Sequence, residues 1–362
     1  MGKEQQKMKN TGGVGARERI QNTRPIRLQL PSRQALESFL RERIIGQDEF
    51  IRKILVAIYR RLMFGLKTNI MVVGQSGSGK TETIKEMAEV MHLPYTIENA
   101  TEYTQSGYVG NDIETIVDNL YENAKIHGNL SVLPIISIVV MDEIDKKAED
   151  QSMVRGESVS GVAVQQRLLK FMEGMKLKAI DQQTGAMFQI NTEYTIFVCM
   201  GAFEGLDDIR KERLNKRTVG FKKEQKSQII DKTEHAYTEA DFIKFGMIKE
   251  FIGRFDCIAE TKKLTQDDLE NIIRNSKISA FREYEQVLAN NGVIISYSDA
   301  MIKTMAKKAF SLNIGARGIR SVVNYIFENI LCDVMDGADH VTNKCNLEDD
   351  IVYDNTKYEF VP

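Results

Sequence analysis

The 362-residue chain is 42% hydrophobic and 28% charged, a balance typical of a well-packed soluble protein with about two domains. Its 49 basic and 51 acidic residues give a formal net charge of −2, which offers no electrostatic case for bulk nucleic-acid binding. No apolar run approaches the roughly 20 residues that a membrane-spanning helix needs. The N-terminus also lacks the apolar core of a secretory signal.

The cysteines and histidines give no sign of a metal site. Cys199, Cys257, Cys332 and Cys345 are far apart and form no C-x-x-C pair, so no zinc is expected. The histidines are isolated from one another, and we interpret them as ordinary surface or core residues. Free thiols suit a reducing compartment, and the sequence therefore predicts a cytoplasmic protein without a membrane partner.

A flexible tail is expected at residues 1–30, because this segment is polar and contains a Gly-Gly pair. Pro31-Ser32 then predicts the start of a helix, with Ser32 as its N-cap. A second helix has apolar residues at helical spacing from Ile51 to Leu62. Between the two helices, Ile44-Ile45-Gly46-Gln47 is compatible with an ordinary turn or with a contact of Ile45 to the adenine of a nucleotide.

The strongest motif is a phosphate-binding loop. Four apolar residues, Ile70–Val73, run directly into Gly-Gln-Ser-Gly-Ser-Gly-Lys-Thr, the G-x-x-x-x-G-K-T pattern. The glycines allow a tight turn whose N–H groups point at a phosphate, and the following helix adds its N-terminal dipole. Lys80 is expected to reach the β- and γ-phosphates of a nucleoside triphosphate, and Thr81 to ligate Mg²⁺. The predicted nucleotide-binding residues of this loop are Gly74, Gln75, Ser76, Gly77, Ser78, Gly79, Lys80 and Thr81.

An acidic pair follows the next strongly apolar segment. Pro134–Met141 is continuously apolar apart from one serine and predicts a buried strand of a parallel sheet. It ends in Asp142-Glu143, and carboxylates in that position are costly without a role. Beside a phosphate loop, Asp142 would support Mg²⁺, and Glu143 would orient and deprotonate the attacking water. The alternative is a merely solvated strand end, which the phosphate loop disfavours.

Two further segments present apolar side chains in polar surroundings. Gly107-Tyr108-Val109-Gly110 brackets an aromatic residue and a valine with glycines, which favours an exposed loop over a plain turn. Val219-Gly220-Phe221 is an apolar island within the highly charged residues 210–235, and indicates a docking segment where charge alone would mean only solvation. Lys176–Gln189 contains Thr184-Gly185 and predicts a hairpin.

The pattern changes to mainly helical from Leu264. Thr265-Gln266-Asp267-Asp268 predicts a capping box at the start of a helix. We therefore expect an α/β domain at residues 31–261 and a mainly helical domain at residues 262–362. Further helices are predicted at about 277–290, 298–310 and 316–336, and short strands at Val293–Tyr297 and near 349–354.

Taken in this order, the motifs resemble the ClpX family of AAA+ protein unfoldases. The similarity runs from Ile44 to about Asp336 and is dense at the phosphate loop, at Met141–Lys146 and at Gly315–Arg320. The resemblance implies an AAA+ fold, with a P-loop parallel-sheet domain and a C-terminal, mainly helical small domain. It also implies an enzyme that hydrolyses ATP with Mg²⁺ and unfolds proteins as a homohexameric ring.

The resemblance further implies roles for individual residues. Gly107-Tyr108-Val109-Gly110 matches the pore loop that grips an unfolded polypeptide in the ring. Arg254 matches the arginine finger, which acts on the γ-phosphate of the neighbouring subunit. Arg317 matches sensor 2, which reaches the nucleotide from the small domain of the same subunit. Val219-Gly220-Phe221 falls where the family has the apolar tripeptide that docks on the ClpP peptidase.

Some positions depart from the family pattern. The family's four-cysteine zinc domain and the basic loop at its channel entrance have no counterpart in the sequence. The docking tripeptide begins with Val219 where isoleucine or leucine is usual, a loss of about 1 kcal/mol per contact at most. Met200 stands in place of a small residue near sensor 1. Docking on a ClpP-type peptidase is thus compatible with the sequence but not required by it.

These departures leave two alternative functions. One is a chaperone that remodels a specific complex without a peptidase, motivated by the absent zinc domain and the altered tripeptide. The other is an AAA+ nucleic-acid motor, against which the near-neutral charge and the apolar loop at Gly107–Gly110 both argue. An ATP-dependent unfoldase remains the leading hypothesis.

Overall fold

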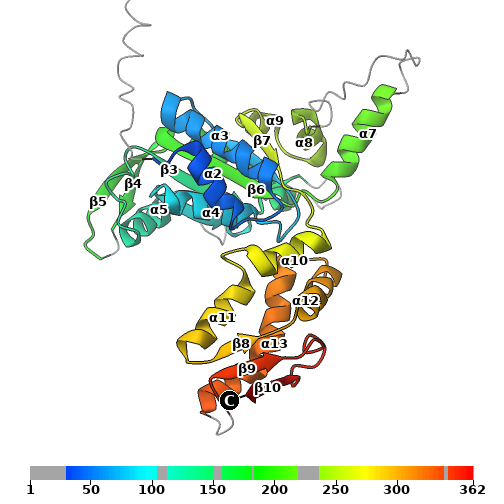
Figure 1. The fold of residues 1–362 in the computed structure, drawn as a ribbon. Helices are drawn as coiled ribbons and strands as arrows, with labels where there is room; N and C mark the ends of the chain where they lie inside the picture. The colour runs from blue at the N-terminus through cyan, green and yellow to red at the C-terminus, as the bar shows by residue number, and fades with distance from the viewer. Residues whose placement is uncertain are drawn as a thin grey trace, which may run out of the picture.

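The computed structural model describes residues 30–103, 112–149, 157–181, 183–218, 236–337 and 341–361. The first part of the chain is an α/β structure and the second is mainly helical (Figure 1), so the predicted fold class is confirmed. The predicted tail up to residue 29, the loop Gly107–Gly110 and the tripeptide Val219-Gly220-Phe221 lie outside the described residues. None of the helices in the described ranges combines the length and apolarity that a transmembrane span requires.

The centre of the α/β part is a five-stranded parallel sheet with the order β2-β3-β6-β1-β7. Because every strand runs the same way, all carboxyl ends meet at one edge, where Gly74 follows β1 and Asp142 ends β3. The predicted buried strand therefore exists, although it begins three residues later than expected. The strands are β1 (Ile70–Val73), β2 (Tyr95–Asn99), β3 (Ser137–Asp142), β6 (Thr195–Gly201) and β7 (Cys257–Glu260).

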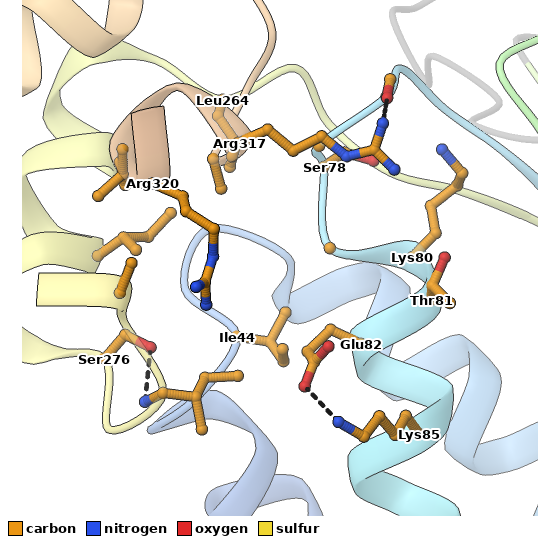
Figure 2. Close-up of a pocket in the computed structure, with 18 of the residues that line it drawn as sticks. Ile44, Ser78, Lys80, Thr81, Glu82, Lys85, Leu264, Ser276, Arg317 and Arg320 are labelled. Atoms are coloured by element: carbon orange, nitrogen blue, oxygen red, sulfur yellow. Dashed lines mark hydrogen bonds and ion pairs between the residues drawn. The ribbon is translucent and has the colours of Figure 1, made fainter. Parts of the chain in front are cut away.

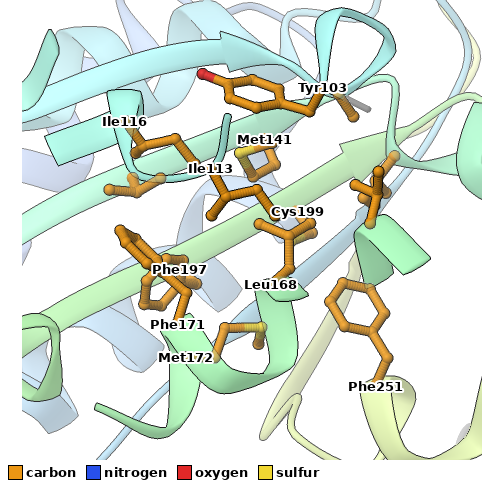
Figure 3. Packing of buried hydrophobic residues seen from close by; sticks show 14 of the residues in the cluster. Tyr103, Ile113, Ile116, Met141, Leu168, Phe171, Met172, Phe197, Cys199 and Phe251 are labelled. Carbon is orange, nitrogen blue, oxygen red and sulfur yellow. The ribbon is translucent and has the colours of Figure 1, made fainter. Parts of the chain in front are cut away.

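Helices cover both faces of this sheet. Ile70 and Val72 of β1 pack into one apolar core, whereas Met71 and Val73 pack into the other, part of which is drawn in Figure 3. Burial on both faces explains why the strands are continuously apolar and do not alternate. The main covering helices are α2 (Arg33–Arg41), α3 (Asp48–Phe64) and α4 (Lys80–Val90) on the first face, and α5 (Thr115–Ile126) and α6 (Glu157–Glu173) on the second.

Short elements complete the α/β part. The hairpin predicted in Lys176–Gln189 is confirmed as an antiparallel pair of strands. A short 3₁₀ helix, η1, directly follows β2. A second one, η2, follows β3 after the single residue Glu143. These elements are η1 (Ala100–Glu102), η2 (Ile144–Lys147), β4 (Lys176–Ile180), β5 (Met187–Asn191), η3 (Thr192–Tyr194), α7 (Leu206–Thr218), α8 (Glu239–Phe245) and α9 (Lys249–Ile252).

The mainly helical part has its own apolar core. It begins with the predicted capping box, in which the Thr265 hydroxyl accepts the Asp268 N–H (3.1 Å) and the Asp268 carboxylate accepts the Thr265 N–H (2.9 Å). The division at residue 261/262 remains a prediction. The elements are α10 (Gln266–Asn275), α11 (Ala280–Asn290), β8 (Ile294–Ser296), α12 (Asp299–Ser311), α13 (Arg317–Asp336), β9 (Lys344–Leu347) and β10 (Tyr358–Val361).

The prediction of a strand near residues 349–354 is wrong. This segment is the turn that joins the antiparallel strands β9 and β10. The carbonyl of Asp350 accepts the N–H groups of Tyr353 (2.8 Å) and Asp354 (3.3 Å). Ile351 and Val352 are buried in the helical core, and their apolarity therefore reflects a packed turn and not a strand.

Candidate nucleotide site

The loop Gly74–Thr81 joins the end of β1 to the start of α4, as the motif predicts. Gly77 (φ +72°) and Gly79 (φ +89°) adopt left-handed conformations, which residues with a Cβ atom rarely tolerate. The N–H of Gly74 donates to the carbonyl of Gly201 at the end of β6 (3.1 Å). The loop therefore has the tight, sheet-anchored shape that a phosphate cradle requires.

Lys80 is the first residue of α4 and is almost entirely buried. Its ammonium donates to two carbonyls of the loop itself, those of Gly74 (2.6 Å) and Gln75 (2.9 Å). Burial lowers the pKa of Lys80, while the carboxylates of Asp142 and Asp145 act in the opposite direction. Phosphate oxygens are stronger partners for an ammonium than carbonyls are, so this lysine can exchange them on ligand binding.

The acidic end of β3 lies directly against the loop. The Thr81 hydroxyl donates to Asp142 (2.9 Å), and the other oxygen of that carboxylate accepts the N–H of Glu143 (2.9 Å). Glu143 has φ +57°, a strained conformation for a residue with a side chain. A hydroxyl beside a carboxylate is the oxygen ligand set that Mg²⁺ prefers.

The helical part contacts the phosphate loop through the backbone of both. The N–H of Ala316 donates to the carbonyl of Gly77 (2.8 Å). A Cβ atom on Gly77 would lie 2.2 Å from the carbonyl oxygen of Ile314, so no other residue fits there. Arg317, the first residue of α13, donates to the Ser76 hydroxyl (2.6 Å). The loop is thus shared between the two parts of the chain.

A cavity of about 910 Å³ lies between the α/β part and the helical part. Arg317 and Arg320 extend into it from α13, opposite Lys80 and Thr81 of α4 (Figure 2). The lining is mixed, and its apolar residues offer a surface that can receive a planar base. These apolar residues are Ile44, Ile45, Leu264, Ile272 and Ile319; the predicted site residues Ser76, Gly77, Ser78, Gly79, Asp142 and Glu143 also line the cavity.

Three residues near the cavity are not predicted from the sequence. Arg43 and Arg320 line it and pair with Glu86 (3.0 Å) and Glu283 (2.7 Å). Arg320 lies three residues after Arg317, and this helical spacing is the signal that would have found it. Gln47 is buried and exchanges two hydrogen bonds of 2.9 Å with the backbone of Lys262 in the linker between β7 and α10.

Arg254 is the predicted site residue that the structure places elsewhere. It follows α9 and does not line the cavity. Its carbonyl accepts the side-chain amide of Asn69 (2.9 Å), and its guanidinium pairs with Glu173. The arginine is about half exposed, so it is available to a neighbouring molecule but not to the nucleotide of its own chain.

The fold and the shared phosphate loop define the class of this protein as an AAA ATPase. The profile of the AAA domain (Cdc48 subfamily) matches residues 66–258. The profile of the C-terminal, D2-small domain, of ClpB protein matches residues 264–343. Together the two profiles cover the α/β part from residue 66 onward and most of the helical part.

Similar proteins narrow the class to one family. The chain is 33% identical over 326 residues to "ATP-dependent Clp protease ATP-binding subunit ClpX" of Bacteroides thetaiotaomicron, covering 85% of the chain and 77% of that protein. It is 34% identical over 325 residues to ClpX of Porphyromonas gingivalis (84% and 77%) and 33% identical over 338 residues to ClpX of Treponema denticola (88% and 80%). The chain belongs to the ClpX family, and the predicted ATP-dependent function is confirmed at that level.

Proposed function

We propose that this protein is an ATP-driven unfoldase in which hydrolysis at the cavity moves a polypeptide. The observation that carries the proposal is the contact between Gly77 and the turn Ile314–Ala316. Because the loop that would bind phosphate also holds the helical part, a change of nucleotide alters how the two parts sit against each other. A motor needs such a link between its chemistry and its movement.

The cavity residues fit ATP with Mg²⁺. Gly77 and Gly79 allow the left-handed turn that aims backbone N–H groups at a phosphate, and Lys80 supplies the positive charge. Thr81 and Asp142 would hold the metal, whose charge helps to neutralise the phosphate oxygens. Ile45, one of the apolar residues of the lining, would contact the adenine.

Hydrolysis would use residues of both parts of the chain. Glu143 accepts a proton from the attacking water. The water oxygen bonds to the γ-phosphorus while the bond from that phosphorus to the ADP oxygen breaks. The strained backbone of Glu143 supports this role, because strain of this kind persists where a side chain must be held in place. Arg317 would neutralise developing charge on the γ-phosphate from the same subunit.

The position of Arg254 supports a ring. It is outside the cavity of its own chain, so an arginine finger at this position serves only a neighbour. Each nucleotide site would then be completed by the next subunit in a closed homohexamer. On this proposal, an isolated subunit hydrolyses ATP poorly.

We extend to this chain what its relatives are named for, namely the ATP-binding subunit of an ATP-dependent protease. Gly107-Tyr108-Val109-Gly110 would grip the polypeptide, and Val219-Gly220-Phe221 would dock on a ClpP-type peptidase. Family membership supports this function over a peptidase-independent chaperone and over a nucleic-acid motor.

Glu143→Gln tests the proposal. The variant should bind ATP as the wild type does, lose hydrolysis, and fail to unfold a fluorescent β-barrel protein that carries an unstructured tail. Glu204→Gln is the matched control, since Glu204 is another carboxylate that lines the cavity. Persisting hydrolysis in Glu143→Gln would exclude Glu143 as the base.

A further inference from the structure

A buried carboxylate lies outside the nucleotide site, at the end of the edge strand β2. Glu98 is only 6% exposed. Its oxygens accept short hydrogen bonds from the hydroxyls of Thr96 (2.6 Å) and Tyr103 (2.6 Å). The side-chain amide of Asn119 lies 3.2 and 3.1 Å from the two oxygens. Three neutral side chains therefore satisfy this carboxylate.

This arrangement stabilises one specific geometry. An ionised carboxylate in the interior is costly unless its lone pairs are filled. Hydroxyl donors at 2.6 Å are in the range of charge-assisted hydrogen bonds, which are about twice as strong as neutral ones. Burial, with the bond to Glu98, raises the pKa of Tyr103, so this hydroxyl remains a donor. Loss of any donor would leave the carboxylate underpaired.

The network joins both flanks of residues 104–111. Tyr103 immediately precedes this segment and is fully buried, with its ring in the same core as Ile113 and Met141 (Figure 3). Asn119 lies on α5, the first helix after the segment. One carboxylate on β2 thus fixes the chain before the segment and the helix after it.

The same strand is adjacent to the catalytic end of β3. Asn99 of β2 lies opposite Asp142 of β3 in the parallel register. The ammonium of Lys147 in η2 donates to the carbonyl of Thr101 in η1 (3.4 Å). The turn that follows Glu143 therefore lies against the turn that leads to Tyr103.

We propose that Glu98 and Tyr103 are positioning residues for polypeptide gripping, because the hydrogen bonds of Glu98 to Tyr103 and Asn119 tie the chain on both sides of residues 104–111 to the sheet edge that carries Asp142 and Glu143. The inference rests on the proposed function of Gly107-Tyr108-Val109-Gly110. The anchor makes Tyr103 and α5, on either side of that segment, follow movements of the sheet edge. Without it, ATP is hydrolysed but less of the movement reaches the polypeptide.

Tyr103→Phe tests the inference, because it removes one hydroxyl and leaves the ring in its core. Tyr95→Phe is the matched control: Tyr95 is on β2, the strand that carries Glu98, and its hydroxyl also donates to a glutamate, Glu89 (2.8 Å). The full-length protein is assayed for basal ATPase activity, for stimulation of that activity by reduced carboxymethylated α-lactalbumin, and for hydrogen exchange. Tyr108→Ala is assayed in parallel.

Tyr103→Phe should retain basal ATPase activity and lose most of the stimulation by the unfolded protein. Amide exchange at residues 100–103 and 112–119 should become about tenfold faster, as expected for one lost charge-assisted bond. A Tyr103→Phe protein that matches Tyr95→Phe in stimulation and exchange would overturn the inference. If Tyr108→Ala keeps full stimulation, the proposed gripping role fails instead, and the exchange data still decide whether the anchor exists.

Discussion

Arg317 donates a hydrogen bond of 2.6 Å to the hydroxyl of Ser76, although 241 residues separate them in the sequence. The first residue of α13 thereby touches the loop proposed to bind phosphate. An arginine in this position can detect whether the loop is occupied, since phosphate oxygens are stronger acceptors for a guanidinium than a serine hydroxyl is.

Arg317→Ala should reduce the ATPase kcat by about 100-fold, the usual effect of removing one donor to developing charge. ATP affinity should change much less, because Lys80 and the loop N–H groups remain. Steady-state kinetics with a separate binding titration would measure both quantities. Arg320→Ala provides the comparison, since Arg320 is one turn further along α13 and already pairs with Glu283; an equal loss of kcat in both variants would contradict a specific role for Arg317.

Gly77→Ala should both destabilise the protein and weaken nucleotide binding. The new methyl group would lie 2.2 Å from the carbonyl oxygen of Ile314, in addition to the strain of φ +72°. Gly128→Ala separates the two effects, because Gly128 has φ +70° and no atom of the described ranges lies within 4 Å of the added atom. Thermal unfolding should show a loss of about 1 kcal/mol for Gly128→Ala from strain alone and a clearly larger loss for Gly77→Ala. Equal losses of stability in the two variants would mean that the backbone near Ile314 moves away from residue 77 at little cost.

The parts of this site that the sequence predicts are those encoded in contiguous residues. Gly74–Thr81 and Asp142-Glu143 carry their chemistry in local spacing and lie at strand ends, and the parallel topology brings strand ends to one edge. The capping box at Thr265 is predictable for the same reason, because all its bonds fall within four residues.

Contacts between distant segments are not predictable in this way. Gln47 and Lys262 exchange two hydrogen bonds across 215 residues, and no local pattern marks either as a partner of the other. In the sequence, Glu98 has the pattern of an ordinary polar residue of an edge strand. Only the structure shows that Tyr103 and Asn119 donate hydrogen bonds to it. The error at residues 349–354 has a related cause, since Ile351 and Val352 are apolar because of the core they fill and not because of a strand.

Asp145 should lower the free energy of unfolding more at neutral pH than at acidic pH, which is opposite to the usual effect of a paired carboxylate. One of its oxygens accepts the N–H of Phe203 (3.1 Å), and the other is buried with no hydrogen-bond partner among the residues that the structure describes. Burial raises the pKa of this carboxyl above its usual value. The penalty for the charged form is therefore present at neutral pH and is relieved as the pH falls through the raised pKa.

Asp145→Asn keeps an acceptor for Phe203 and removes the buried charge. It should raise the free energy of unfolding at pH 7 by on the order of 1 kcal/mol, and the gain should shrink as the pH falls. Asp181→Asn should behave oppositely, because the Lys125 side chain and the N–H of Thr184 hold the pKa of Asp181 well below its usual range. Its pairing stabilises the protein above the unfolded-state pKa and is lost at lower pH. Denaturant titrations from pH 2 to pH 7 would contradict this account if both variants shifted in the same direction.

The proposal that Arg254 acts on the neighbouring subunit can be tested by mixing two inactive proteins. Arg254→Ala keeps Glu143 but supplies no finger to its neighbour, whereas Glu143→Gln keeps the finger but loses the base. In a ring of both, a site on an Arg254→Ala subunit becomes complete whenever its neighbour is a Glu143→Gln subunit. Random assortment at equal amounts should restore about a quarter of the sites in a closed ring.

If Arg254 acted within its own subunit, every site would still lack one of the two groups, and mixing would restore nothing. The ATPase rate of the mixture, measured after subunit exchange, therefore distinguishes the two cases directly. Mixing Arg254→Ala with the double variant Arg254→Ala/Glu143→Gln controls for nonspecific effects of mixing, because no subunit then carries the finger. Recovery in the first mixture and not in the second would establish that the cavity between α4 and α13 is completed by an arginine from outside the chain.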